Sequence, residues 1–235
     1  MKVINDLYDY ENLKIVQESE SFKFSLDSLL LAEFVDSVDN SKLILDLCTG
    51  NAVVPLVLSY YYPNKIVGFE IQEEIYQLAE ESICFNHLEH QISLYHDTVI
   101  HIGKYFPGNN FDIITANPPY FKYNKTSLVN ENVQKAIARH EIYLSLEELF
   151  QVVKYALKEN GVFYLVHLPE RLEEILALCE KYRLVAKKVQ FIYTKENTNA
   201  GIVLVKCVNN ARNALVVSSP LYISKYKSYK NIFRK

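Results

Sequence analysis

Strand-like and helix-like stretches alternate along most of this chain, and the alternation predicts an α/β fold with a seven-stranded, mostly parallel sheet and helices on both faces. Short apolar runs such as Lys42–Leu47 have the composition of buried parallel strands, and a stretch with helical character follows. Two later strand-like runs are separated by a loop without helical periodicity, which predicts a C-terminal antiparallel hairpin. Since 49% of the 235 residues are hydrophobic, we expect a sizeable core in a single domain over residues 1–235.

The individual elements are predicted from local signals. Strands are expected at five apolar runs: 42–47, 65–70, 91–95, 111–116 and 162–167. Helices are expected at 51–61, 73–86, 145–157 and 170–182. Ser145 and Glu148 have the spacing of a capping box, and Pro169 suits the first turn of the last helix. The hairpin is expected from 187–193 and 201–208, with an N-terminal extension at about 1–40 and a basic C-terminal hook at about 210–235.

Charge is distributed unevenly, although the net charge is only −3. Residues 1–180 carry 13 basic and 27 acidic residues, whereas residues 181–235 carry 12 basic residues and one acid, Glu196. A basic end on an acidic body suggests a polyanionic partner docked there, and Lys187, Lys188, Lys225 and Lys227 are candidates for contacting it. The alternative is that these lysines are solvated side chains of two strands and a tail.

Composition also limits the cellular compartment and the kinds of binding site that we expect. No apolar run approaches the length of a membrane span, and the N-terminus lacks the apolar core of a signal peptide. The four cysteines are widely spaced, which fits the reducing cytosol better than a disulfide framework, so we expect a cytoplasmic protein. His87, His90, His96 and His101 lie close in sequence without nearby cysteines, and we expect no metal site and no obligate protein partner.

Acidic residues stand at the ends of the first three predicted strands. Open α/β sheets bind ligands beyond the carboxyl ends of their strands, so these acids are candidates for a binding site. Asp46 precedes a loop with one glycine, where an acid would repel a pyrophosphate but accept an ammonium group. Glu70 could bind both hydroxyls of a ribose, and Asp97 with Thr98 could bind an adenine edge. Amino acid, ribose and adenine in this order describe S-adenosylmethionine, while the alternative for any one acid is a helix N-cap.

The fourth predicted strand leads directly into Asn117-Pro118-Pro119-Tyr120. The two prolines stiffen this corner and push the residues before them toward extended backbone. The Asn117 side-chain oxygen and the Pro118 carbonyl could accept both N–H groups of a planar amine, while Tyr120 stacks on its ring. Accepting both N–H bonds on neutral oxygens would restore electron density to a nitrogen that is otherwise a weak nucleophile. The corner therefore predicts methylation of an exocyclic amine, with positioning supplying most of the rate.

Several segments resemble those of a known enzyme family. Asp-Leu-Cys-Thr-Gly-Asn-Ala at 46–52 and Asn-Pro-Pro-Tyr at 117–120 resemble the first and fourth motifs of class I S-adenosylmethionine-dependent amino-methyltransferases, which have a Rossmann-like fold. Further segments resemble the bacterial tRNA(Val) adenine-N6-methyltransferases, which modify the base beside the anticodon: Phe22–Phe34, Ala138–Glu141, Ser145–Phe150 and Pro220–Tyr229. The resemblance covers nearly the whole chain and implies a tRNA partner. Ala52 departs from the pattern, because such loops often carry glycine there.

The resemblance also implies roles for individual residues by position. The residues implied to line the cofactor pocket are Asp46, Cys48, Gly50, Glu70, Ile71, Asp97, Thr98 and Asn117. Three residues of the N-terminal extension would close over it: Phe24, Ser25 and Asp27. Asn117 and Pro118, in the corner that Pro119 stiffens, would hold the amine, and Tyr120 the base. Arg139 and His140 could contact an RNA phosphate, with an ion pair between Arg139 and Glu141 as an equal alternative.

Other substrates remain open at this point. Similar Asn-Pro-Pro-Tyr motifs occur in methyltransferases that act on protein glutamine and on guanine N2 of ribosomal RNA. Those families usually carry a sizeable domain before the first motif, whereas only about 45 residues precede Asp46 here. Basic residues interleaved with aromatic ones near the C-terminus favour RNA over a protein. A non-catalytic RNA-binding protein on the same fold is a further alternative, although every clamp and acid position is present.

Overall fold

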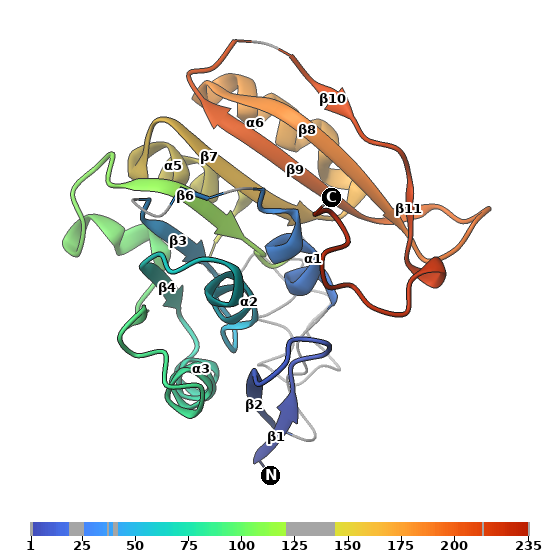
Figure 1. The fold of residues 1–235 in the computed structure, drawn as a ribbon. Helices are drawn as coiled ribbons and strands as arrows, with labels where there is room; N and C mark the ends of the chain where they lie inside the picture. Colours follow the sequence, from blue (N-terminus) through green and yellow to red (C-terminus); the bar gives the residue numbers. More distant parts are fainter. Residues whose placement is uncertain are drawn as a thin grey trace, which may run out of the picture.

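The structure is a computed structural model that describes residues 2–18, 26–36, 38–39, 42–120, 144–212 and 214–234. One large sheet forms its centre, with helices on both faces (Figure 1). The seven main strands of this sheet are β3 (Ile44–Leu47), β4 (Ile66–Glu70), β5 (Ile92–His96), β6 (Phe111–Ala116), β7 (Leu157–His167), β8 (Leu184–Tyr193) and β9 (Ala200–Asn209). Their spatial order is β5-β4-β3-β6-β7-β9-β8, and only β9 is antiparallel to its neighbours. The predicted seven-stranded, mostly parallel sheet with a C-terminal antiparallel hairpin is confirmed.

Two apolar clusters cover the two faces of the sheet, because successive side chains of a strand point to opposite faces. The helices that contribute to these clusters are α1 (Leu26–Phe34), α2 (Val53–Tyr61), α3 (Glu73–Phe85), α5 (Leu146–Ala156), α6 (Leu172–Tyr182) and the 3-10 helix η1 (Val99–Lys104). On one face, Ile44 and Ile113 pack with α1, α2 and α3. On the other face, Leu45 and Ile114 pack with α5, α6 and η1. The helices thus bury both faces, as a parallel sheet requires.

The N-terminal extension forms elements for which the sequence analysis had no assignment. β1 (Lys2–Asp6) and β2 (Lys14–Glu18) pair as an antiparallel hairpin that lies against α3. Val16 of β2 packs with Ile75 and Leu78, and its N–H donates to Ser82 Oγ at 2.9 Å. Helix α1 follows, and its residues 29–34 are all buried. The acidic Glu33 is buried together with its apolar neighbours, so polar and apolar residues do not fall on opposite faces of the helix, which explains why the pattern gave no helix signal.

Several predicted boundaries differ from the structure. Helix α2 begins at Val53 instead of residue 51, because Ala52 has a left-handed backbone with φ 71°. β7 begins five residues early, at Leu157, and passes through Asn160 with φ 59°, where its pairing with β6 shifts register. The helix expected at 170 starts as a 3-10 turn, η3 (Pro169–Arg171), before α6. The capping box that opens α5 is confirmed.

The basic C-terminal hook runs along the edge strand and then returns to the helices. Two short strands, β10 (Val216–Val217) and β11 (Leu221–Tyr222), each pair in parallel with β8. A 3-10 turn, η4 (Ile223–Lys225), leads into a final segment that ends beside α1 (Figure 1). Tyr229, Ile232 and Phe233 pack against the cluster that contains α1 and α2. The end of the hook is therefore folded onto the body of the protein.

Candidate active site at the carboxyl edge of the sheet

Four candidate site residues lie along one edge of the sheet. β3, β4, β5 and β6 are mutually parallel, so their carboxyl ends lie on the same side. The register pairs the last residue of β3 with the next-to-last residue of β4 and with the last residue of β6. Asp46, Glu70, Asp97 and Asn117 therefore stand at this edge, where open α/β sheets bind ligands.

Asp46 is a buried carboxyl group with one unsatisfied oxygen. Asp46 is only 1% exposed, and its Oδ1 accepts a hydrogen bond from Thr115 Oγ1 at 2.6 Å. Its Oδ2 is buried and has no hydrogen-bond partner among the described residues. Burial is the main reason that the pKa of Asp46 rises to about 7, with hydrogen bonds from Thr115 and Thr49 opposing the rise. The free oxygen is suited to a ligand that can donate hydrogen bonds or carries positive charge.

The loop after β3 has an unusual backbone. Cys48, Gly50 and Ala52 all have positive φ angles, of 60°, 58° and 71°. This conformation favours glycine, so Ala52 occupies its position against the usual preference of an L-residue. Gly68 of β4 lies directly against this loop and leaves no room for a side chain, because a Cβ atom there would lie 2.6 Å from Thr49 Oγ1. The half-buried Cys48 thiol has a raised pKa, chiefly through burial, so it stays protonated.

Glu70 links the end of β4 to this loop. It is 6% exposed, its Oε2 accepts from the Gly50 N–H at 2.9 Å, and its Oε1 accepts from the Gln72 N–H at 2.8 Å. Burial raises the pKa of Glu70, and the backbone donors counteract the rise. Each oxygen keeps a lone pair for a further donor. Ile71 follows directly and is 38% exposed, which leaves apolar surface next to the carboxylate.

Asp97 is engaged with its own local structure. It accepts hydrogen bonds from the Thr98 N–H, from His101 Nδ1 at 2.8 Å and from the Tyr105 hydroxyl at 2.8 Å. Although desolvation acts to raise it, these donors lower the pKa of Asp97 to about 2. The Thr98 side chain caps η1 by accepting from the Ile100 N–H. These contacts match the capping alternative considered for single acids, and a role for Asp97 and Thr98 in binding adenine stays a prediction.

The Asn117–Tyr120 corner contacts the first turn of α1. Asn117 Nδ2 donates to Ser28 Oγ at 2.8 Å, and the Tyr120 hydroxyl donates to Asp27 Oδ2 at 2.7 Å. Pro118 is buried, whereas Asn117, Pro119 and Tyr120 are half-buried. Asp27 was expected to close over a cofactor, and in the structure its carboxylate accepts the hydrogen bond from Tyr120. Ser28 was not among the expected residues, since no local pattern shows that it meets a residue 89 positions away.

Tyr120 lies between two oxygen atoms but has only one proton to donate. Its hydroxyl oxygen is 2.7 Å from Asp27 Oδ2 and also 2.7 Å from Asn117 Oδ1. Burial and the Asp27 carboxylate raise the pKa of Tyr120, so the phenol is neutral. The carboxylate is the stronger acceptor, because hydrogen bonds to ionised groups are stronger than neutral ones. Asn117 Oδ1 therefore keeps most of its capacity to accept from another donor.

A neutral histidine borders the corner. His167 ends β7 and is fully buried, and its ring centroid is 5.2 Å from that of Tyr120. Its Nδ1 accepts from the Leu168 N–H at 2.8 Å, which leaves the proton on Nε2. Burial, with a smaller contribution from Arg171, lowers the pKa of His167 to about 4. His167 was not among the predicted site residues, although its place at the end of the fifth strand satisfies the same rule as the acids.

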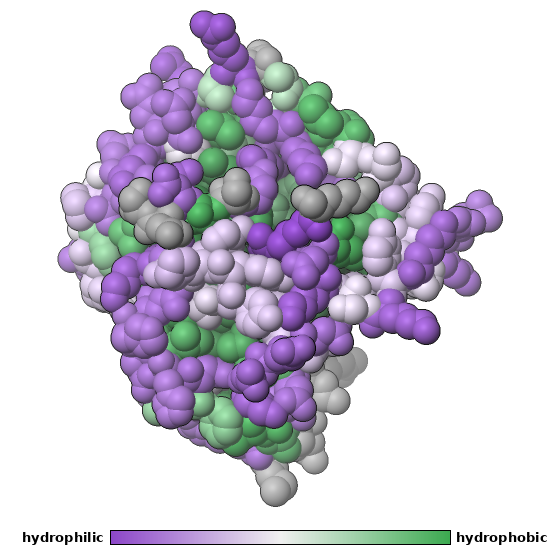
Figure 2. All heavy atoms as spheres, in the orientation of Figure 1, coloured by the Kyte–Doolittle hydropathy of each residue, from purple (hydrophilic) through white to green (hydrophobic). Residues whose placement is uncertain are grey.

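The predicted RNA-contacting residues are dispersed along the basic quarter of the chain. Lys188 Nζ lies 4.9 Å from the centroid of the Phe34 ring, and Lys187 donates to a backbone carbonyl. Lys225 pairs with Glu196, and Lys227 is exposed. Figure 2 shows hydrophilic side chains projecting from the β8–β9 loop, at the far right of the molecule. Four further predicted residues, Phe24, Ser25, Arg139 and His140, lie outside the described residues.

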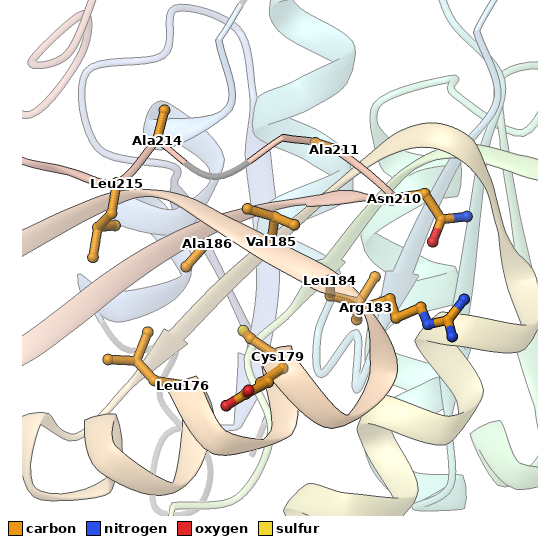
Figure 3. Close-up of a pocket in the computed structure, with 11 residues that line it drawn as sticks. Leu176, Cys179, Arg183, Leu184, Val185, Ala186, Asn210, Ala211, Ala214 and Leu215 are labelled. Atoms are coloured by element: carbon orange, nitrogen blue, oxygen red, sulfur yellow. The ribbon is translucent and has the colours of Figure 1, made fainter.

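A separate cavity lies at the opposite edge of the sheet. It has a volume of about 580 Å³ and lies between α6, the start of β8 and four later residues, Asn210, Ala211, Ala214 and Leu215 (Figure 3). β8 runs in the same direction as β7, so its first residue, Leu184, belongs to the amino edge. This cavity is therefore not part of the candidate active site. Within the described ranges, no helix could span a membrane and no three side chains of His, Cys, Asp or Glu are grouped to hold a metal ion.

Comparison with known proteins places this geometry in context. The model of the methyltransferase small domain family matches residues 23–194. Two relatives are named tRNA1(Val) (adenine(37)-N6)-methyltransferase. The protein from Pedobacter heparinus is 26% identical over 83% of this chain and 80% of its own length. The protein from Bacteroides thetaiotaomicron is 28% identical over 81% of this chain and 78% of its own length. A solved structure described as a predicted O-methyltransferase of Agrobacterium tumefaciens aligns with a TM-score of 0.64 and 18% identity, over 84% of this chain and 87% of that one. The resemblance inferred from the motifs is confirmed.

Proposed function

The chain belongs to the methyltransferase small domain family, and from this premise we propose that it methylates N6 of an adenine beside the anticodon of a tRNA, with S-adenosylmethionine as the methyl donor. The observation that carries the proposal is the Asn117–Tyr120 corner, which stands at the same sheet edge as the buried carboxyl groups of Asp46 and Glu70. The choice of adenine and of tRNA is supported by the relatives, whose names specify adenine 37 of a valine tRNA.

The buried polar atoms after β3 and β4 fit this cofactor. Asp46 Oδ2 is buried without a partner among the described residues, and a buried carboxylate needs compensation, which an ammonium group would provide. The lone pairs left on Glu70 suit the two hydroxyls of a ribose, and the exposed Ile71 side chain offers an apolar surface to an adenine ring. When bound, S-adenosylmethionine supplies a methyl group already activated by a positively charged sulfur.

Asn117 and Pro118 hold the target amine through neutral acceptors. With Asn117 Nδ2 donating to Ser28 Oγ, the amide oxygen Oδ1 is the acceptor for a substrate N–H, and one of its two lone pairs is free even when the other faces the Tyr120 hydroxyl. The Pro118 carbonyl accepts the second N–H. Accepting both N–H bonds raises the electron density on the amine nitrogen, and because neither neutral acceptor removes a proton, the nitrogen attacks first and releases its proton to water afterwards. The stiff proline corner supplies the positioning on which this kind of reaction depends.

Tyr120 and its neighbours form the platform for the base. Asp27 anchors the Tyr120 hydroxyl, which fixes the plane of the ring for stacking at about 1–3 kcal/mol per base. His167 remains neutral beside it, because its pKa is about 4, and so adds no charge next to the base. A base inside a folded RNA would have to be extruded to reach this platform.

The direct test is the nucleoside content of tRNA from cells with and without the protein, measured by mass spectrometry. The proposal predicts that N6-methyladenosine disappears from one tRNA species when the protein is absent. A loss of N2-methylguanosine from ribosomal RNA, or of methylated glutamine from a protein, would assign the clamp to a different amine. Binding of S-adenosylmethionine by the purified chain without transfer to any RNA would favour the non-catalytic alternative.

A further inference from the structure

We propose that residues 229–234, in the basic C-terminal hook, act as a latch that positions helix α1, and through α1 the side chain of Asn117. We call these residues the terminal latch. Helix α1 contacts the latch at its C-terminal end and the catalytic corner at its N-terminal end. The proposal rests on the proposed function, because it assigns the latch a part in orienting the amine-binding group.

Arg234 is the centre of the latch. Its guanidinium carbon lies 3.7 Å from the centroid of the Tyr61 ring, which is a stacked cation–π geometry. Nη1 donates to the Tyr62 hydroxyl, and Nη2 donates to the carbonyl of Ala32 in α1 at 3.5 Å. Nε lies 3.5 Å from Glu33 Oε2, also in α1. The Arg234 side chain is thus held by two helices at once.

Glu33 explains why α1 needs this cation. Its side chain is completely buried, and its Oε1 accepts from the hydroxyl groups of Tyr10 and Tyr61. Its Oε2 has no hydrogen-bond partner among the described residues, so the ion pair with Arg234 is what compensates that oxygen. A buried carboxylate that loses its counter-ion is no longer compensated, and a shift toward water lowers the energy of its charge. Loss of Arg234 would therefore favour displacement of the C-terminal end of α1, which carries Glu33, toward solvent.

Other latch residues hold the same surface. The Phe233 ring lies 5.4 Å from that of Phe34, the last residue of α1. Lys230 Nζ donates to the Tyr60 hydroxyl at 2.7 Å, and Asn231 Oδ1 lies 3.1 Å from the Tyr61 hydroxyl oxygen, whose proton goes to Glu33. The basic side chains of the latch are therefore used within the protein, unlike the exposed Lys227 before it.

Helix α1 carries the effect to the catalytic corner. It has only nine residues and is hydrogen-bonded throughout, so it moves as a unit. Its first turn contributes Asp27, which holds Tyr120, and Ser28, which holds Asn117. A shift of the Glu33 end would tilt these two contacts. Since small misplacements of a reacting group lower the rate strongly, the latch should affect turnover more than RNA affinity.

The test compares Arg234→Gln with a double variant, Glu33→Gln and Arg234→Gln together, and with Lys195→Ala in the β8–β9 loop as the control. The substrate is full-length tRNA, and all assays run well below each variant's melting temperature. We expect Arg234→Gln to lower kcat about tenfold or more, with the KM for tRNA and the dissociation constant for S-adenosylmethionine within about twofold. The double variant should recover much of the kcat, because a neutral Glu33→Gln side chain needs no counter-ion. Lys195→Ala should behave as wild type.

Hydrogen exchange tests the latch independently of the proposed function. Arg234→Gln should speed amide exchange in residues 26–34 and should not do so in α3, and this holds whether or not the tRNA is the true substrate. If the wild-type chain methylates no tRNA, the proposed function fails and the exchange result alone decides for or against the latch. Should Arg234→Gln fail to fold, Arg234→Lys keeps the charge without the planar stacking and should show the same effects, reduced. A raised KM for tRNA at unchanged kcat, or unaltered exchange in α1, would overturn the latch.

Discussion

The buried carboxyl group of Asp46 should make cofactor binding dependent on pH. Burial raises its pKa to about 7, so the free protein holds a proton there at lower pH. A ligand ammonium group binds the ionised carboxylate, and it stays protonated below its own pKa of about 8. Affinity for S-adenosylmethionine should therefore rise with pH. If only the ionised form binds, the dissociation constant should increase about 16-fold from about pH 7 to about pH 5.5, equivalent to ~1.6 kcal/mol.

Titration calorimetry of the RNA-free protein with S-adenosylmethionine, across this pH range, measures the effect. Asp46→Asn should weaken binding near neutral pH and remove the pH dependence. It should also raise the free energy of unfolding near pH 7, by up to about 4 kcal/mol, because the raised pKa destabilises the wild type as pH rises from about 4 to 7. Asp112→Asn is a matched control, since Asp112 pairs with Lys158 at the other end of β6. Affinity that is flat with pH in the wild type, or equally steep in Asp46→Asn, would refute this role for Asp46.

Three further predictions concern the surroundings of the site. His167, with a pKa of about 4, should lower the wild type's free energy of unfolding by about 3 kcal/mol relative to that of His167→Leu as pH falls from about 6.5 to 4; urea denaturation of both proteins measures this difference, because the opposite contribution of Asp46 is common to both. Gly68→Ala places a Cβ 2.6 Å from two side-chain atoms and should destabilise the fold by about 2 kcal/mol and weaken cofactor binding, whereas Gly201→Ala, with open space around it, should do neither. Lys227→Gln should reduce the slope of log affinity for tRNA against log salt by about 0.7–0.9, with Lys195→Gln as the unaffected control; equal slopes would exclude a phosphate contact at Lys227.

The alternation of strands and helices follows from local patterns, which is why the mostly parallel sheet was predictable. Runs such as Phe111–Ala116 are buried on both faces and lie between helical segments, and such alternation leaves few topologies. The structure of the N-terminal part was harder to predict from the sequence. Residues 29–34 of helix α1, Glu33 included, are buried between the sheet and the terminal latch, so its sequence has no continuous polar face to reveal a helix. The two short strands β10 and β11 depend on pairing with β8, and two residues carry no periodicity.

The site was predictable where it depends on strand ends and unpredictable where it depends on contacts between distant elements. The positions of Asp46 and Glu70 follow once the strands are known to be parallel. The contacts of Ser28 and Asp27 with the corner require α1 to cross the carboxyl edge, and nothing local specifies that crossing. Likewise, the pairing of Arg234 with Glu33 joins residues at opposite ends of the chain, so the charge pattern alone suggested an RNA contact for the whole hook.

The most direct test of the central claim is single-turnover methylation of unmodified tRNA by the wild type and by Asn117→Ala, with methylated nucleosides identified by mass spectrometry. The account predicts N6-methyladenosine from the wild type. It also predicts no detectable product from Asn117→Ala, while that variant's dissociation constant for S-adenosylmethionine changes only a few-fold. Near-normal methylation by Asn117→Ala would show that the amide at this corner does not bind the amine, and would contradict the account.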